Sequence, residues 1–143
     1  MILKILKSNV MTVMLYGSEC WRITDTEILK LETFHRKCLR HILNIWWPNV
    51  ITNSELYEKS KTVSVKAEIE KRRLRLLGHI LRMPNHRVPK IALKWTPATG
   101  KRSRGRPKCT WRRTIERDLK ARGLTMGEAA FIGKDRSKLR SLD

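Results

Sequence analysis

The sequence predicts an all-α protein: a small helical array with a basic Gly/Pro loop and a C-terminal helical hairpin. Three observations predict this class. Apolar residues recur at helical spacing along most of the chain, and no convincing alternating strand pattern appears. Gly and Pro cluster between the periodic segments, as is typical of loops. A Thr followed three residues later by Glu, the capping-box pattern that begins a helix, occurs as Thr24 with Glu27, Thr52 with Glu55 and Thr125 with Glu128.

Length and composition limit the kind of protein this is. The chain has 143 residues, 41% of them hydrophobic, which suffices for one small domain or two very small ones. Five Trp and a steady supply of Leu and Ile argue against disorder along the whole chain. No stretch approaches ~18 uncharged apolar residues, so no membrane span is expected. The formal charge of +19 indicates a polyanionic partner, nucleic acid first and an anionic membrane surface second.

The first half of the chain is predicted to contain three helices. Residues 3–20 carry apolar side chains at helical spacing. The first capping box begins a helix of about 20 residues, which ends at Trp46-Trp47-Pro48-Asn49 because proline cannot continue the hydrogen-bond ladder. Both tryptophans are expected to pack at this helix end. The second capping box begins a short helix that runs through Glu58.

The segment 64–83 is predicted to be a helix with one apolar face and one cationic face. At 100° per residue its Val, Ile, Leu and Met side chains fall within about half of the circumference. Arg73 falls inside the apolar arc, where we expect its stem to pack and its head to reach solvent. The other half of the helix carries Lys71, Arg72, Arg75, His79 and Arg82.

A basic loop is predicted to divide the chain. Val88-Pro89 begins a short helix toward Trp95, since proline is tolerated in a first turn. Residues 96–109 are rich in Pro, Gly, Lys and Arg, as expected for an exposed linker. The sequence therefore predicts a helical region over 1–95 and a C-terminal hairpin over 110–143.

The hairpin is predicted to contain two amphipathic helices. Thr110 caps the first of them, and Gly123 ends it as a C-terminal glycine. The third capping box begins the second helix, over 126–133, and Asp135 caps a final turn. The apolar stripe of the first helix is Trp111, Ile115 and Leu119, and its opposite face is Arg113, Arg117 and Lys120.

The positive charge is concentrated in the second part of the chain. Residues 1–60 hold 8 basic and 6 acidic residues, whereas residues 61–143 hold 24 and 7. No acidic residue lies between Glu70 and Glu116. A one-sign run of this length is destabilising unless an anion neutralises it. The candidate nucleic-acid-binding residues are Lys71, Arg72, Arg75, Arg82, Lys101, Arg102, Arg104, Gly105, Arg106, Pro107, Lys108, Arg112, Arg113, Arg117 and Lys120.

The loop contains a short motif that resembles an AT-hook. Its core is Arg104-Gly105-Arg106-Pro107. In such a motif an extended Gly-Arg-Pro lies in the narrow minor groove of A·T-rich DNA. Two other interpretations stay open: contact with a nucleic-acid backbone of any sequence, and a solvated linker. Trp95 and Trp111 bracket the loop, either as stacking platforms for bases or as anchors that fix the loop ends to the core.

Nothing in the sequence indicates catalysis. The acidic residues are scattered, and most are explained as helix-cap or first-turn residues. No serine-hydrolase, zinc-protease or phosphate-loop motif is present. We therefore expect no enzymatic activity from this chain and no cofactor.

The cysteines predict a reducing compartment. The three of them are odd in number and widely spaced, so a disulfide framework is not expected and the chain is placed in the nucleus or cytoplasm, not outside the cell. His35, Cys38 and His41 lie three residues apart and could share a helix side, but a fourth metal ligand would have to come from far away. A buried cysteine between surface histidines is the simpler interpretation.

Several strings together resemble the C-terminal region of reverse transcriptases from non-LTR retrotransposons, the RTE-like group of LINE elements. Residues 15–21, LYGSECW, resemble the LYGSExW signature of that family, and residues 72–83, RRLRLLGHILRM, resemble its RRLRWLGHxLRM block. The basic core 104–107, then residues 110–114 and 135–137, complete the same order. The resemblance covers nearly the whole chain.

This resemblance implies a role in holding nucleic acid. In the family, which has RNA-directed DNA polymerase and endonuclease activities, the endonuclease and the catalytic palm lie upstream of this region. Residues 1–95 would then be a thumb-end or connection-like region, with the upstream polymerase domain as a further partner. The region would help to hold template RNA or target DNA in target-primed reverse transcription. The alternatives are a host-domesticated DNA-binding protein that uses the AT-hook-like loop, and a non-functional truncated relic, which the abrupt start of the match at Met1 fits.

Three positions depart from the family pattern. Leu76 and Leu139 stand where members carry Trp, and Gly133 stands where a better helix former is usual. A glycine in mid-helix costs up to ~1 kcal/mol relative to alanine.

Overall fold

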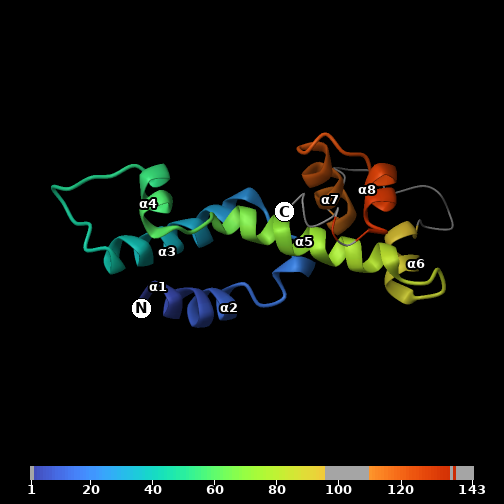
Figure 1. Ribbon diagram of the computed structural model, residues 1–143, viewed down its shortest axis with the longest axis horizontal. Helices are drawn as coiled ribbons and strands as arrows, with labels where there is room; N and C mark the ends of the chain where they lie inside the picture. The colour runs from blue at the N-terminus through green and yellow to red at the C-terminus, as the bar shows by residue number, and fades with distance from the viewer. Residues whose placement is uncertain (1, 96–109, 136, 138–143) are drawn as a thin grey trace, which may run out of the picture. The chain divides into compact units, whose positions relative to one another are not determined.

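The computed structural model describes residues 2–95, 110–135 and 137. Every regular element in these ranges is a helix (Figure 1), so the predicted all-α class is confirmed. The chain divides into two compact units, residues 1–70 and 71–143. This division falls inside the helix α5 (Val65–Arg82). The linker predicted at 96–109 lies outside the described residues, and the division of the chain there stays a prediction.

Unit 1, residues 1–70, begins differently from the prediction. The helix predicted over 3–20 ends at Met14 and contains a π-helical turn. Gly17 has φ of 67°, in the left-handed region that stops a right-handed helix, and a 3₁₀ turn follows. The elements of unit 1 are α1 (Ile2–Ile5), η1 (Leu6–Val10), α2 (Met11–Met14), η2 (Ser18–Cys20), α3 (Asp25–Ile42), α4 (Asn53–Ser60) and the first part of α5.

All three predicted capping boxes are formed. At the start of α3 the Thr24 amide donates to Glu27 Oε2 at 2.7 Å, and the Glu27 amide donates back to Thr24 Oγ1 at 3.4 Å. Each box satisfies amide groups that a helix start leaves without intrahelical partners. The same reciprocal arrangement begins α4 at Thr52 and α8 (Met126–Ile132) at Thr125.

Unit 1 buries two apolar clusters. One joins the N-terminal segment and the start of α3 to the first part of α5, and the other joins η1, the end of α3 and α4. Val65 and Ile69 in the first cluster belong to the apolar face predicted for the segment 64–83. The first contains Leu15, Ile23, Ile28, Val65 and Ile69, and the second contains Leu6, Leu39 and Leu56.

Unit 2, residues 71–143, is built around the second part of α5. The helices α6 (Val88–Lys94), α7 (Trp111–Lys120) and α8 lie beside it (Figure 1) and share one core with it. Leu93 joins α6 to this core, so α6 packs with the helices of the predicted hairpin. The buried members are Leu74, Leu77, Ile80, Leu93, Ile115, Leu119 and Ala129.

The end of α7 confirms the predicted C-terminal glycine. Gly123 has φ of 70°, and its amide donates to the Lys120 carbonyl at 3.0 Å. The next amide, of Leu124, donates to the Leu119 carbonyl at 3.0 Å. This pair of bonds is a Schellman motif, which needs a residue that tolerates the left-handed conformation.

Arg73 does not lie at the rim of the core as predicted. Its side chain is only 1% exposed, and its Nε lies 3.2 Å from Oδ2 of Asp118, which is itself buried on α7. A charged group leaves water only when a partner of opposite charge accompanies it. Asp118 supplies that charge, and this is why an arginine occupies an apolar face.

Candidate nucleic-acid interface

The helix α7 separates an interior face from a cationic one. Its interior positions, Thr114, Ile115, Asp118 and Leu119, are buried. They recur at the spacing of one helical face, so the remaining positions must point outward. The exposed positions are Arg112, Arg113, Glu116, Arg117 and Lys120, four cations and one carboxylate.

The second part of α5 presents a narrower cationic face. Arg75, His79 and Arg82 are exposed at i, i+4 and i+7, whereas Lys71 and Arg72 are half-buried. The Nη1 of Arg82 donates to the carbonyl of Gly133 at 2.9 Å and so also holds the end of α8. The predicted cationic face of this helix is therefore present, with Arg82 in a structural role as well.

The carboxylates in the described part of unit 2 have internal roles. Asp118 pairs with Arg73, and Glu116 Oε1 accepts from Arg112 Nε at 3.0 Å. Glu128 completes the capping box of α8, where the Thr125 backbone and side chain lower the pKa of its carboxyl group. Asp135 accepts from the Ser137 amide at 2.9 Å. The outer surface of this unit is consequently dominated by cations.

The predicted loop residues lie outside the described residues. These are Lys101, Arg102, Arg104, Gly105, Arg106, Pro107 and Lys108, so the AT-hook-like interpretation stays a prediction.

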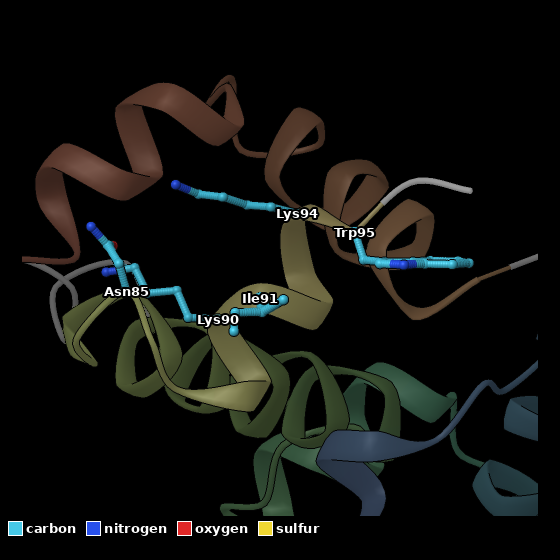
Figure 2. Close-up of a pocket in the computed structure, with 5 residues that line it drawn as sticks. All are labelled: Asn85, Lys90, Ile91, Lys94 and Trp95. Atoms are coloured by element: carbon cyan, nitrogen blue, oxygen red, sulfur yellow. The ribbon is translucent and has the colours of Figure 1, made fainter. Parts of the chain in front are cut away.

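The two tryptophans that bracket the loop differ. Trp111 packs against the core of unit 2, whereas Trp95 is 66% exposed. Trp95 lines an open hollow of about 430 Å³ together with Asn85, Lys90, Ile91 and Lys94. Figure 2 shows that Lys94 and Trp95 leave the end of α6 in opposite directions. Trp111 is therefore a core residue, and Trp95 is accessible.

One of the two lysines that line this hollow is bound to backbone carbonyls of the same unit. The ammonium group of Lys90 donates to the carbonyls of Leu81 at 2.8 Å and Met83 at 2.7 Å. Leu81 lies in the last turn of α5 and Met83 directly follows the helix, where carbonyl groups have no intrahelical partner and attract a cation. Lys90 thus caps α5, and Lys94 is the lysine of the hollow that faces solvent.

In unit 1, Glu32 is a buried polar residue that the sequence did not single out. The Tyr57 hydroxyl donates to its Oε2, and the Lys66 amide donates to its Oε1 at 3.0 Å. Burial, together with the hydrogen bond to Glu32, raises the pKa of Tyr57 to about 12. Burial also lowers the pKa of His35, whose ring lies 5.9 Å from that of Tyr57. This network joins α3, α4 and α5 and is structural.

The metal site weighed at His35, Cys38 and His41 is not assembled. His35 is buried and His41 is exposed, so the two imidazoles occupy different sides of α3. Among the described residues no group of three His, Cys, Asp or Glu side chains is placed to hold a metal ion. In the same residues no helix combines the length and the apolar character required to cross a membrane.

Trp47 does not pack at the end of α3 as predicted, whereas Trp46 contacts the ring of His41 in the last turn of that helix. Trp46 is 56% exposed and Trp47 is 88% exposed. The helix end is covered instead by Ile45 and Ile51, which pack against the cluster of Leu39. The prediction for Trp47 was wrong because an apolar residue type does not by itself show which of several neighbouring side chains fills a limited space.

No family model, no curated protein and no solved structure matches the chain. The resemblance to non-LTR reverse transcriptases therefore depends on the order of the motifs quoted above.

Proposed function

We propose that the chain binds nucleic acid through its phosphate backbone, with the cationic faces of α7 and of the second part of α5. The observation that carries this proposal is the exposed face of α7, with four cations and one carboxylate opposite a buried apolar stripe. Lys and Arg side chains on phosphates dominate the affinity of most nucleic-acid-binding proteins. A membrane-surface role is less favoured, because the apolar face of each helix is used for the core of unit 2.

The dimensions of α7 agree with a phosphate ligand. A helix of 10 residues is about 15 Å long. One strand of a duplex carries a phosphate every ~3.4 Å of its axis, so about four phosphates lie alongside such a helix. Three exposed cations of α7, Arg113, Arg117 and Lys120, are spread along this length, and Arg112 pairs with Glu116.

At the level of the whole protein, we infer a nucleic-acid-binding C-terminal fragment of a non-LTR retrotransposon reverse transcriptase. We expect no catalytic activity from this region, which would help to hold template RNA or target DNA. The order of the motifs from residues 15–21 to 135–137 supports this origin, and the cationic surface of unit 2 supports the role.

The test is a salt series on matched charge variants. The wild-type chain is titrated with a primer–template hybrid, single-stranded RNA, and A·T-rich and G·C-rich duplex DNA. The triple variant Arg113→Gln, Arg117→Gln, Lys120→Gln should bind more weakly. Its plot of log K against log salt should be shallower by about 0.9 for each phosphate that the variant no longer neutralises. The control removes three exposed lysines of unit 1, Lys4→Gln, Lys7→Gln and Lys59→Gln, and should change the slope little.

The possible outcomes of the salt series distinguish the candidate functions. Equal slope changes in the two triple variants would show that total charge matters and not the face of α7. No binding by the folded wild-type chain would contradict a nucleic-acid role. A preference for A·T-rich duplex that persists in salt, and is lost on replacing Arg102, Arg104 and Arg106 with Ala, would favour the domesticated AT-hook protein.

A further inference from the structure

Unit 1 carries an exposed row of cations and rings along α3. Lys30, Phe34, Lys37 and His41 are all exposed, and Phe34 is 47% exposed. Their spacing of i, i+4, i+7 and i+11 places them within ~60° of one another around the helix. Glu27, one turn before Lys30, interacts electrostatically with Lys30 and marks the N-terminal limit of the row.

The loop that follows α3 is held so that its tip projects outward. Asn44 has φ of 51°, and the Ile45 amide donates to the Arg40 carbonyl at 2.9 Å, which ends the helix in a Schellman turn. Ile45 and Ile51 then pack into the core of unit 1 at the two ends of the loop. Between these anchors Trp47 is 88% exposed and Val50 is 82% exposed. The exposure of Trp47 is thus fixed by packed residues on both sides.

A ring contact joins the helix row to this loop. The imidazole of His41 meets the indole of Trp46 edge to face, with ring centroids 5.4 Å apart. On the other side of the loop, Arg40 Nη2 donates to Asn53 Oδ1 at 2.9 Å and connects the end of α3 to the start of α4. The row and the loop tip together form what we call the α3 strip: Lys30, Phe34, Lys37, His41, Trp46 and Trp47.

The composition of the α3 strip indicates the class of ligand that it binds. Residues 33–54 contain Arg36, Lys37 and Arg40 and no acidic residue; Arg36 pairs with Glu32 of the preceding turn, so Lys37 and Arg40 supply the positive charge here. Cations interleaved with accessible aromatic rings are the arrangement that binds single-stranded nucleic acid, because the cations contact phosphates and the bases stack on the rings. A duplex cannot use the rings in this way, since its bases are already stacked on each other.

We propose that the α3 strip binds unpaired nucleotides and that Trp47 is a stacking platform for a base. This site goes beyond the phosphate-binding role of unit 2, because it lies on the other unit and distinguishes single strands from duplexes. The cations of unit 2 supply affinity for either form of nucleic acid, and the α3 strip supplies the preference for unpaired segments.

The test compares Trp47→Ala with Val50→Ala in the full chain. Both replace an exposed apolar side chain of the same loop, but only the first removes a ring. Binding to an oligouridylate and to a duplex of equal length is measured by fluorescence anisotropy, and folding is checked by circular dichroism. Trp47→Ala should bind the oligouridylate at least about fivefold more weakly and the duplex unchanged, whereas Val50→Ala should match wild type on both. Trp47→Phe should restore most of the lost affinity.

Three results would overturn the proposal. The first is an equal loss of affinity for the oligouridylate and the duplex in Trp47→Ala, and the second is no loss of affinity for either. The third is self-association that depends on Trp47 while the affinity for single strands is unchanged, which would make the loop a protein-docking surface. The α7 triple variant tests the role of unit 2 in the same assay, so the two proposals fail separately. Lys37→Gln provides a second check and should make the salt dependence of oligouridylate binding shallower.

Discussion

At the scale of single residues, the interior of unit 2 depends on one buried ion pair. Arg73 comes from α5 and Asp118 from α7, so the pair connects two helices through residues that are 45 positions apart in sequence. Buried pairs of this kind contribute little net free energy relative to apolar residues of the same size, but removing one partner leaves a charge without compensation. The pair therefore fixes how α7 packs against α5.

Asp118→Asn should destabilise the chain by about 3–5 kcal/mol, because it leaves the Arg73 guanidinium buried without a counter-charge. Urea unfolding followed by circular dichroism measures this loss. Glu116→Gln is the matched control on the same helix: its ion pair with Arg112 is exposed, and its loss should cost at most ~1 kcal/mol. The double variant Arg73→Met, Asp118→Leu should recover most of the stability. A cost for Asp118→Asn no greater than that of Glu116→Gln would contradict the role of the pair.

Neither member of this pair could be assigned a partner from the sequence. Periodicity placed Arg73 on the apolar face correctly, but the identity of a partner 45 residues away depends on how α5 and α7 dock. The same applies to two partners of Glu32, Tyr57 and Lys66, which lie on two other helices, whereas its ion pair with Arg36 has the i,i+4 spacing of a single helix. Side-chain pairs within one helix can be anticipated from spacing, whereas pairs between helices require the packing first.

At the scale of elements, local signals predicted most of the fold. The three capping boxes, Pro89 in the first turn of α6 and Gly123 after α7 all act through neighbours a few residues away, and the structure confirms each of them. The N-terminal segment was predicted poorly, because its apolar spacing continued through Gly17, where the backbone leaves the right-handed region. The placement of Trp47 was wrong for a different reason, since the helix end had already been filled by Ile45 and Ile51.

Gly133 departs from the pattern of the family that the chain resembles, and its surroundings explain why a glycine fits this position. It follows α8, where a Cβ atom would lie 2.8 Å from the Ala129 carbonyl oxygen and 3.1 Å from Leu81 Cδ1. The end of α8 therefore lies so close to α5 that an added Cβ would crowd the Leu81 side chain, which would have to shift by a few tenths of an ångström. The same approach brings the Gly133 carbonyl within hydrogen-bond distance of Arg82.

Gly133→Ala should accordingly destabilise unit 2 by about 1–3 kcal/mol, the usual cost of overpacking. Gly127→Ala is the control at the start of the same helix, because a Cβ there meets only Thr125 Oγ1 at 3.9 Å. That substitution should leave stability unchanged or raise it by up to ~1 kcal/mol through helix propensity. Thermal unfolding by circular dichroism distinguishes the two. Equal effects of the two substitutions would show that the contact with Leu81 is not tight.

At the scale of the whole molecule, the uneven charge should make stability depend on salt. Residues 61–143 carry 24 basic and 7 acidic residues, so the folded chain concentrates like charges. Raising the salt concentration from about 0.01 M to 0.15 M shortens the screening length from ~30 Å to ~8 Å and weakens this repulsion. The melting temperature should therefore rise with salt. The melting temperature of the α7 triple variant, which has fewer cations, should rise less with salt. A melting temperature that falls with salt would mean that attractive ion pairs outweigh the repulsion.

The position of the unit boundary inside α5 also has a consequence during synthesis on the ribosome. The apolar clusters of unit 1 are complete once Ile69 has emerged, so that unit can close early. Leu77 and Ile80 in the second part of α5 then remain without their packing partner Leu119. That residue emerges 39 positions after Ile80. At ~5–20 residues per second this delay lasts roughly 2–8 seconds. The chain made in that interval includes the most cationic stretch of the sequence, and its charge opposes aggregation of the nascent protein while its apolar helix face is still open.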